Sequence, residues 1–131
     1  MVIDTSALLA VLLQEPDAGG VAQAIAAGSP RLLSAASLLE ASIVTESRKG
    51  EAGGCELDLL MYRGGIEVVA VDQDQAEIAR AAWRRFGRDR HPAALSYGDC
   101  FAYALARSRR LPVLFRGNDF SQTDIDCVPV P

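Results

Sequence analysis

The feature that most constrains the fold of this chain is an alternation of short apolar runs with longer helical patterns. No hairpin signal separates consecutive runs, so neighbouring strands are not expected to be antiparallel. Parallel strands need long crossover connections, which are usually helices. The alternation therefore predicts an α/β domain with a mainly parallel central sheet flanked by helices. The runs expected to form strands are Val2-Ile3, Leu32-Leu33, Ile66 to Val71 and Pro112 to Phe115.

Helical patterns fill the segments between these runs. Glycines at 50, 53 and 54 are expected to separate the third helix from the fourth. The fifth helix begins with Asp74-x-x-Glu77, which resembles a capping box, and the sixth is apolar nearly all round and so predicted to be buried. The expected helices are Thr5 to Leu13, Asp17 to Ala27, Ser34 or Ser37 to Arg48, Cys55 to Arg63, Asp74 to Phe86 and Gly98 to Arg109.

The length of 131 residues suits one domain with a buried core, and we expect a single domain over residues 1–131. No secretory signal is visible, and the apolar run from Leu8 to Leu13 is too short to span a membrane. A cytoplasmic protein is the simplest interpretation. The three cysteines lack CxxC spacing, so we expect buried free thiols and neither a disulfide framework nor a zinc site.

Four acidic residues occupy positions where a lone acid is awkward: Asp4, Glu40, Asp99 and Asp119. All but Glu40 follow a predicted strand or open a predicted helix, and such points gather at the carboxyl edge of a parallel sheet. Glu40 lies among apolar residues of its helix, where a carboxylate costs desolvation energy unless an arginine or a cation pairs with it. Each acid, taken alone, also fits an ordinary structural role. Asp4 and Asp99 can be helix caps, and Asp119 can be a turn residue.

If the four carboxylates converge, their repulsion determines their chemistry. Two unit charges about 4 Å apart interact by roughly 4 kcal/mol at an effective dielectric constant near 20. Either some of the groups take up protons or a divalent cation neutralises them. Oxygen ligands without a nearby histidine or cysteine pair favour Mg²⁺ or Mn²⁺. Such a site suits hydrolysis of a phosphodiester.

The net charge of −4 argues at first against a nucleic-acid substrate. The cations are concentrated, however, because five arginines fall between positions 80 and 90. We predict a basic edge beside the acidic site, and an aromatic contact to RNA next to Asp99. The residues expected to bind RNA are Arg84, Arg85, Arg88, Arg90 and Tyr97. The single histidine, His91, is predicted to be a solvated loop residue.

Four segments in order resemble the successive motifs of PIN-domain proteins, and they are most similar to the VapC toxins of bacterial VapBC toxin–antitoxin pairs. The motifs span nearly the whole chain. They are Val2-Ile3-Asp4-Thr5-Ser6-Ala7-Leu8, the Ser-x-x-x-Glu helix that holds Glu40, Leu95-Ser96-Tyr97-Gly98-Asp99-Cys100-Phe101, and Leu114-Phe115-Arg116-Gly117-Asn118-Asp119-Phe120.

This resemblance implies a ribonuclease in which Asp4 and Asp99 ligate Mg²⁺ or Mn²⁺. It implies a catalytic or metal-binding role for Glu40, a supporting role for Asp119, and a Ser6 that orients the first acid. It also implies a homodimer and a small VapB-type antitoxin whose tail blocks the acidic groove, often with a basic side chain. The sequence departs from the pattern at Phe115, where many relatives carry a small hydroxyl residue.

Two other classes of protein place an acid after a first strand. An α/β phosphatase needs a second acid two residues after Asp4, where Ser6 stands. A Mg²⁺-binding receiver module needs a lysine after its last strands, and Lys49 is the only lysine. Both remain alternatives on the sequence alone. Neither a phosphate-binding glycine-rich loop nor a GxGxxG fingerprint is present.

Overall fold

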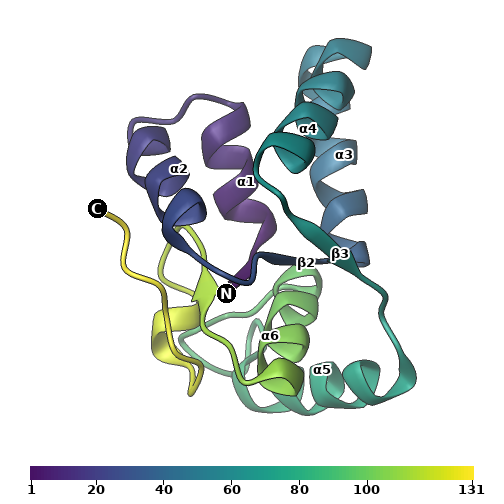
Figure 1. The fold of residues 1–131 in the computed structure, drawn as a ribbon. Coiled ribbons are helices and arrows are strands. Elements are labelled where there is room, and N and C mark those ends of the chain that lie inside the picture. The colour runs from purple at the N-terminus through teal and green to yellow at the C-terminus, as the bar shows by residue number, and fades with distance from the viewer.

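A computed structural model describes residues 1–131, and it contains four strands, six α-helices and one 3₁₀ turn (Figure 1). The elements in chain order are β1 (Val2–Ile3), α1 (Thr5–Leu12), α2 (Ala18–Ala27), β2 (Leu32–Ser34), α3 (Ala35–Lys49), α4 (Glu51–Arg63), β3 (Glu67–Val69), α5 (Gln73–Phe86), α6 (Tyr97–Arg109), β4 (Val113–Leu114) and η1 (Phe120–Gln122).

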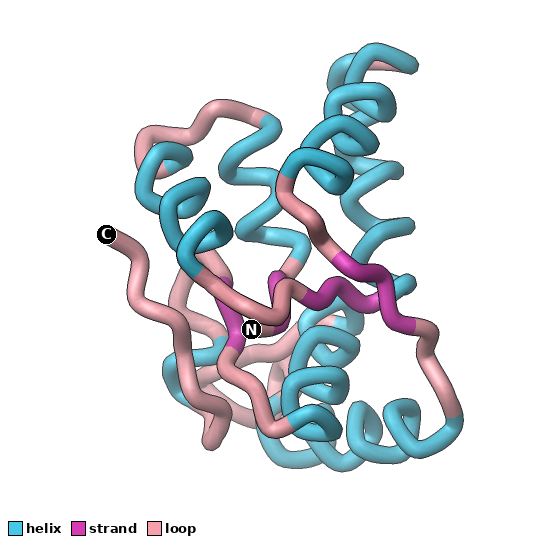
Figure 2. The backbone as a smooth tube through the Cα atoms, in the orientation of Figure 1, coloured by secondary structure: helices cyan, strands magenta, loops and turns pink.

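The strands form one parallel sheet in the order β3-β2-β1-β4. Figure 2 shows this sheet between two helical layers, with α1 to α4 on one side and α5 and α6 on the other. Side chains alternate across the sheet, as strand geometry requires. Val2 packs in the core beneath α5 and α6, whereas Ile3 packs in the core beneath α1 to α4. The predicted α/β class and parallel sheet are confirmed.

Three local predictions are wrong. Only Gly50, with φ of +65°, separates α3 from α4, and Gly53 and Gly54 lie inside α4. Gly53 allows the two helices to pack closely, since a Cβ there would lie 2.6 Å from the Thr45 carbonyl oxygen. The third strand is shorter than predicted because it is an exposed edge strand. The N-cap of α5 is Asp72, whose side chain accepts a hydrogen bond from the Gln75 amide, so Asp74 forms no capping box.

The cysteine prediction holds for one residue of three. Cys100 is buried on α6, while Cys55 and Cys127 are exposed. All three are free thiols, as expected from their spacing. None of the helices combines the length and the hydrophobicity needed to cross a membrane.

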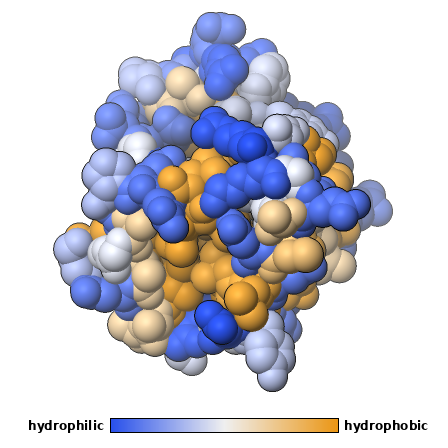
Figure 3. Space-filling model, turned by 90° about the horizontal axis from the view of Figure 1, so that it is seen from above, coloured by the Kyte–Doolittle hydropathy of each residue, from blue (hydrophilic) through white to orange (hydrophobic).

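The surface on the α1 to α4 side carries hydrophobic area. Viewed from above Figure 1, orange side chains form a hollowed band across the middle of this face, framed by blue hydrophilic groups (Figure 3). Helices on this side bear partly buried apolar residues that pack against the core, among them Val11, Leu38, Leu60 and Met61. A face of this kind is unusual for a monomer and typical of an interaction surface.

Candidate active site

The sheet brings the four predicted acids to its carboxyl edge. Asp4 follows β1, and Asp119 follows the neighbouring parallel strand β4. Glu40 lies on α3, which leaves the carboxyl end of β2, and Asp99 lies in the first turn of α6. The charges act on one another, because both Asp99 and Glu40 raise the pKa of Asp4. We call this group of four carboxylates the acidic edge.

Asp4 is the most buried member of the acidic edge, with 3% of its surface exposed. Its backbone amide donates to the Leu114 carbonyl at 2.9 Å, which ties it to β4. Oδ2 caps α1 by accepting hydrogen bonds from the Ser6 amide at 3.0 Å and the Ser6 hydroxyl at 2.6 Å. The other oxygen, Oδ1, is buried without a hydrogen-bond partner. Asp4 therefore caps α1 with one carboxylate oxygen, while its other oxygen has no hydrogen-bond partner.

The pKa of Asp4 is raised to about 7, mainly by burial and also by the charges of Asp99 and Glu40, while the hydrogen bonds from Ser6 act in the opposite direction. Ser6 has a second contact, since its hydroxyl accepts a hydrogen bond from the Arg116 amide at 2.9 Å. Ser6 thus connects the first acid to the segment after β4. The departure at Phe115 has a structural account, because its ring packs edge-on against Phe120.

Asp99 and Asp119 form the other half of the acidic edge. Asp99 belongs to a capping box in which its amide donates to the Ser96 hydroxyl at 3.2 Å and its Oδ2 accepts from the Ser96 amide at 2.9 Å. Asp119 shares a side-chain hydrogen bond with Asp99. Burial raises the pKa of Asp119, the Asp99 charge and this hydrogen bond raise it further, and the charge of Arg88 lowers it. Sequence reasoning overlooks Ser96, although its spacing to Asp99 is the signature of a capping box.

Glu40 reaches the acidic edge from the side. Its half-buried side chain lies against Gly98 on α6, next to a hollow of about 310 Å³ whose lining is mainly apolar. The first turn of α6 therefore lies against the end of the Glu40 side chain. This position explains why Glu40 lies among apolar residues of α3: its carboxylate lies close enough to Asp4, at the carboxyl edge of the sheet, to raise the pKa of Asp4.

The donor set fits a hard divalent cation in its chemistry. All four side chains offer carboxylate oxygens, and the buried Oδ1 of Asp4 has no protein partner. As they lie, however, no three acidic, histidine or cysteine side chains are close enough to form a complete cation site. A cation at this edge would therefore need water ligands or small side-chain movements, and Mg²⁺ usually keeps several waters.

The predicted basic residues have different partners. Arg88 acts on Asp119 and so lies beside the acidic edge. Arg85 instead pairs with Asp124 at 3.1 Å, and the Arg90 guanidinium stacks on the Trp83 ring at 4.3 Å. Arg84 is exposed.

Tyr97, in the first turn of α6, is 82% exposed, and its ring packs edge-on against Phe101 at 4.9 Å. It lies two residues before Asp99. Arg88 and Tyr97 are thus the two predicted RNA-binding residues nearest to the acidic edge in contacts or in sequence.

Comparison with known proteins identifies the family. The sequence pattern of the PIN domain matches residues 1–126. Ribonuclease VapC30 of Mycobacterium tuberculosis is 53% identical over 131 residues, which cover 100% of both chains. Ribonuclease VapC of Mycolicibacterium smegmatis is 55% identical over 128 residues, which cover 98% of this chain and 99% of the relative. The chain belongs to the VapC ribonucleases of the PIN-domain family. The resemblance seen in the four motifs is confirmed.

Solved structures agree with this VapC ribonuclease fold. The crystal structure of Mycobacterium tuberculosis VapC20, described as a toxin that cleaves the sarcin–ricin loop, superposes with a TM-score of 0.81 at 20% identity, covering 99% of this chain and 98% of VapC20. A toxin–antitoxin complex from Klebsiella pneumoniae gives a TM-score of 0.67 at 20% identity over 94% and 92% of the two chains. Membership in the VapC ribonucleases sets aside the phosphatase and receiver-module alternatives.

Proposed function

We propose that this chain is the toxin of a VapBC-type pair and hydrolyses RNA phosphodiester bonds at the acidic edge, with Mg²⁺ or Mn²⁺ bound there. The observation that supports this most is the buried Asp4, whose Oδ1 has no partner and whose pKa is raised to about 7 beside Asp99 and Glu40. A fold tolerates such a carboxylate only at a cost, and a bound cation would offset that cost. PIN-domain ribonucleases generally depend on divalent metals, which agrees with this assignment.

In this proposal Asp4 and Asp99 hold the cation, and Glu40 and Asp119 contribute directly or through water. When bound, the cation supplies an activated water and neutralises charge that develops on the phosphate. Ser6 keeps Oδ2 of Asp4 fixed by two hydrogen bonds, so that Oδ1 remains directed away from the Ser6 contacts. Arg88 and Tyr97 contact the RNA strand beside the reacting phosphate. These roles require Asp4 and Asp99 to be ionised when the cation binds.

The test is cleavage of a single-stranded RNA with Mg²⁺, Mn²⁺ or EDTA by the wild type, Asp4→Asn and Asp99→Asn. Asp58→Asn, an exposed position on α4, is the matched control for loss of one negative charge. We expect cleavage by the wild type and the control in both metals, and no cleavage in EDTA or by either site variant. Full activity in EDTA would contradict the metal requirement, and full activity of Asp4→Asn would contradict the site.

We further propose that a VapB-type antitoxin neutralises this chain in the cytoplasm by covering the acidic edge with a cationic side chain. An arginine can bind carboxylates with two parallel hydrogen bonds, and it would compete with the metal. The apolar band in Figure 3 is a surface for the rest of such a partner. Leu9 on α1 and Leu13, which follows α1, are half-buried and can contribute to this surface, whereas Leu12 is buried in the core.

The toxin role is tested in a bacterium by inducing the chain alone. Growth should stop with the wild type and continue with Asp4→Asn at equal levels of folded protein. Coexpression of the gene that lies next to this reading frame should restore growth if it encodes the antitoxin. Continued growth with soluble, folded wild-type protein would contradict the toxin role but leave the nuclease chemistry open to the cleavage assay.

The homodimer is proposed on a second apolar face, near Glu40. On α3, Leu39 is 62% exposed and Ile43 is 56% exposed. Two mainly apolar hollows of about 310 and 490 Å³ lie on this side, and Tyr97 and Phe101 line both. Burial of Leu39 and Ile43 against a second copy would stabilise a dimer by removing apolar area from water. Leu39→Glu with Ile43→Glu should yield a monomer by light scattering, and a dimer that persists would place the interface elsewhere.

A further inference from the structure

We propose that Gly98 is a positioning residue for Glu40, an inference that rests on the proposed role of Glu40 in the nuclease site. The missing side chain at Gly98 leaves a space in the first turn of α6, and the Glu40 carboxylate fills it. A Cβ at position 98 would overlap Oε2 of Glu40 and would lie 2.7 Å from Oε1 and 2.8 Å from Cδ. Real Cβ contacts shorter than 3.0 Å essentially never occur.

Backbone conformation does not require glycine at this position. Gly98 lies within the regular helix α6, and positive φ angles occur at Gly50, Gly65 and Gly117 but not here. Glycine loses more conformational freedom on folding than alanine, so a helical position that can accept a side chain favours alanine. The helix therefore loses stability by carrying glycine here, and the contact with Glu40 is what the residue provides. The first turn of a helix also carries partial positive charge, which favours a carboxylate against it.

Gly98 differs from the glycines that lie against rigid backbone, and it resembles Gly28 and Gly54, which face only flexible side chains. A Cβ at Gly53 would meet the Thr45 carbonyl oxygen, and one at Gly87 would meet the Trp83 carbonyl oxygen. The three atoms nearest to a Cβ at Gly98 all belong to the free end of the Glu40 side chain. A methyl group at Gly98 would therefore displace Glu40 rather than disturb the fold, which separates a positioning role from a structural one.

The decisive variant is Gly98→Ala in the full-length protein. We expect its melting temperature to equal or exceed that of the wild type, because Glu40 swings aside and alanine favours the helix. Metal-dependent RNA cleavage should fall by roughly 10–100-fold, the usual cost of misplacing a group that supports a metal site. Most of the loss should appear in kcat rather than KM. Gly19→Ala is the matched control, since a Cβ at this exposed helical glycine meets nothing within 4 Å.

A double-mutant cycle with Glu40→Ala tests whether Gly98 acts through Glu40. In the Glu40→Ala background the added Gly98→Ala change should leave the cleavage rate unaltered. The inference would be overturned by a wild-type rate in Gly98→Ala, by an equal loss in both backgrounds, or by unfolding of Gly98→Ala. Crystal structures of Gly98→Ala and the wild type decide the matter even if the wild type shows no metal-dependent cleavage. A displaced Glu40 carboxylate supports the positioning role, and an unmoved one refutes it.

Discussion

The two ends of α6 carry two acidic groups with opposite surroundings. At the first turn is the acidic edge, where Asp99 lies near Asp4, Glu40 and Asp119. Toward the other end is Asp124, which lies on the segment after η1. We call Asp124 and the side chains that contact it the Asp124 cluster. Because Asp99 and Arg107 are eight residues apart on α6, about 12 Å of helix separates the two groups.

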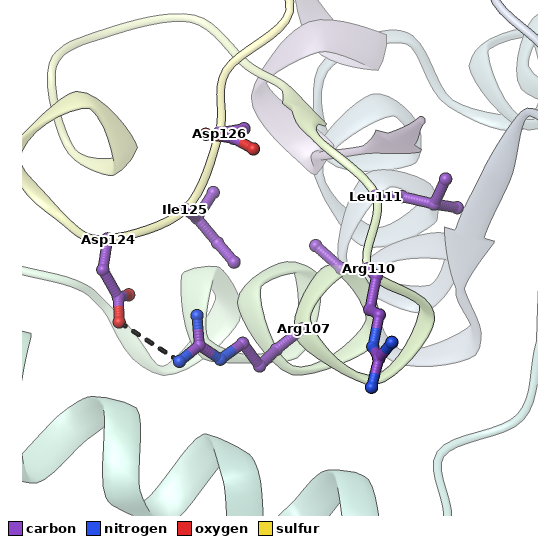
Figure 4. A pocket seen from close by; sticks show the side chains of 7 residues that line it. Arg107, Arg110, Leu111, Asp124, Ile125 and Asp126 are labelled. Atoms are coloured by element: carbon purple, nitrogen blue, oxygen red, sulfur yellow. Dashed lines mark ion pairs between the residues drawn. The ribbon is translucent and has the colours of Figure 1, made fainter.

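Every oxygen of the Asp124 carboxylate has a partner. The Tyr103 hydroxyl donates to Oδ1 at 2.6 Å, and Arg85 and Arg107 approach Oδ2 at 3.1 and 3.5 Å. Figure 4 shows the Arg107 guanidinium directed at Asp124, with the Arg110 guanidinium pointing away from it. In the acidic edge, by contrast, the charge of Arg88 acts on Asp119, and Asp4 has no cationic partner. One group is neutralised within the protein, and the other is not.

The pKa values follow this difference. Burial raises the pKa of Asp124, but the Tyr103 hydrogen bond and the charges of Arg107 and Arg85 outweigh it and lower the pKa. Burial and the contact with Asp124 raise the pKa of Tyr103 to about 12. Asp4, without a cation, has a pKa of about 7. The comparison teaches that a carboxylate with protein partners stabilises the fold, whereas one left without them marks the place where an external cation can bind.

The largest effect is expected from Asp4→Asn. The pKa of Asp4 is raised from 3.8 to about 7 in the folded state. A raised folded pKa gives stability that is present below the unfolded pKa and lost as pH rises through the folded one. The metal-free wild type should thus lose as much as about 4 kcal/mol between about pH 4 and pH 7, since each pKa unit corresponds to 1.36 kcal/mol. Asp4→Asn should escape this loss while losing cleavage altogether.

Urea unfolding in EDTA at pH 4.5 and pH 8 measures this difference. The variant should be the more stable protein at pH 8, and the gap between the two proteins should narrow at pH 4.5. Ser6→Ala is a useful contrast, because it removes the hydroxyl bond to Asp4 and should destabilise the protein where Asp4 is ionised. Equal pH dependence in the wild type and Asp4→Asn would mean that Asp4 is not the costly group.

The effect of Asp124→Asn on stability should be opposite in sign to that of Asp4→Asn, and smaller. A lowered folded pKa gives stability that is present above the unfolded pKa and lost as pH falls through the folded one. The variant should therefore be less stable than the wild type at pH 7 by about 1.5–3 kcal/mol, the usual contribution of hydrogen bonds to a charged group. The difference should shrink as the pH falls from the ordinary aspartate pKa of about 3.9 toward the lower pKa of Asp124 in the folded protein.

Cleavage of RNA by Asp124→Asn should remain close to the wild-type rate at a temperature where both proteins are folded. The matched comparison is Tyr103→Phe, which removes only the hydroxyl that donates to Oδ1. It should cause part of the same loss of stability. If a variant at either position keeps its stability but loses cleavage, the functional site reaches the far end of α6. That result would contradict the assignment of the Asp124 cluster to stability alone.

The acidic edge was largely predictable because its determinants are local in sequence. Asp4, Asp99 and Asp119 each come at the end of a strand or the start of a helix, and the parallel order of strands makes those points meet. The apolar surroundings of Glu40 marked it as unusual. The capping role of Asp4 does not exclude the proposed metal-binding role, since capping uses Oδ2 and leaves Oδ1 without a partner.

The Asp124 cluster was not predictable, because its members come from α5, α6 and the segment after η1. Arg85 and Asp124 are 39 residues apart, and no spacing rule relates them. For the same reason the arginines between positions 80 and 90 looked like one basic edge. Helix α5 ends at Phe86, so Arg85 and Arg88 lie in different elements with different partners. The sequence alone could not show that these arginines fall into separate groups, because only the end of α5 and the tertiary contacts separate them.

The smallest effect, and the sharpest test of this division, is expected from single arginine variants. Arg88→Ala removes the cation beside Asp119, so RNA affinity should fall and its dependence on salt should weaken. For a single-stranded RNA, loss of one phosphate contact lowers the slope of log K against log salt by about 0.7. Arg85→Ala removes the same charge from a position paired with Asp124, and it should leave the slope unchanged while lowering stability. Binding is measured from 50 to 300 mM salt with catalytically inactive Asp4→Asn as the background. If both variants lower the slope equally, RNA contacts both ends of α6, and the Asp124 cluster belongs to the binding surface as well as to the fold.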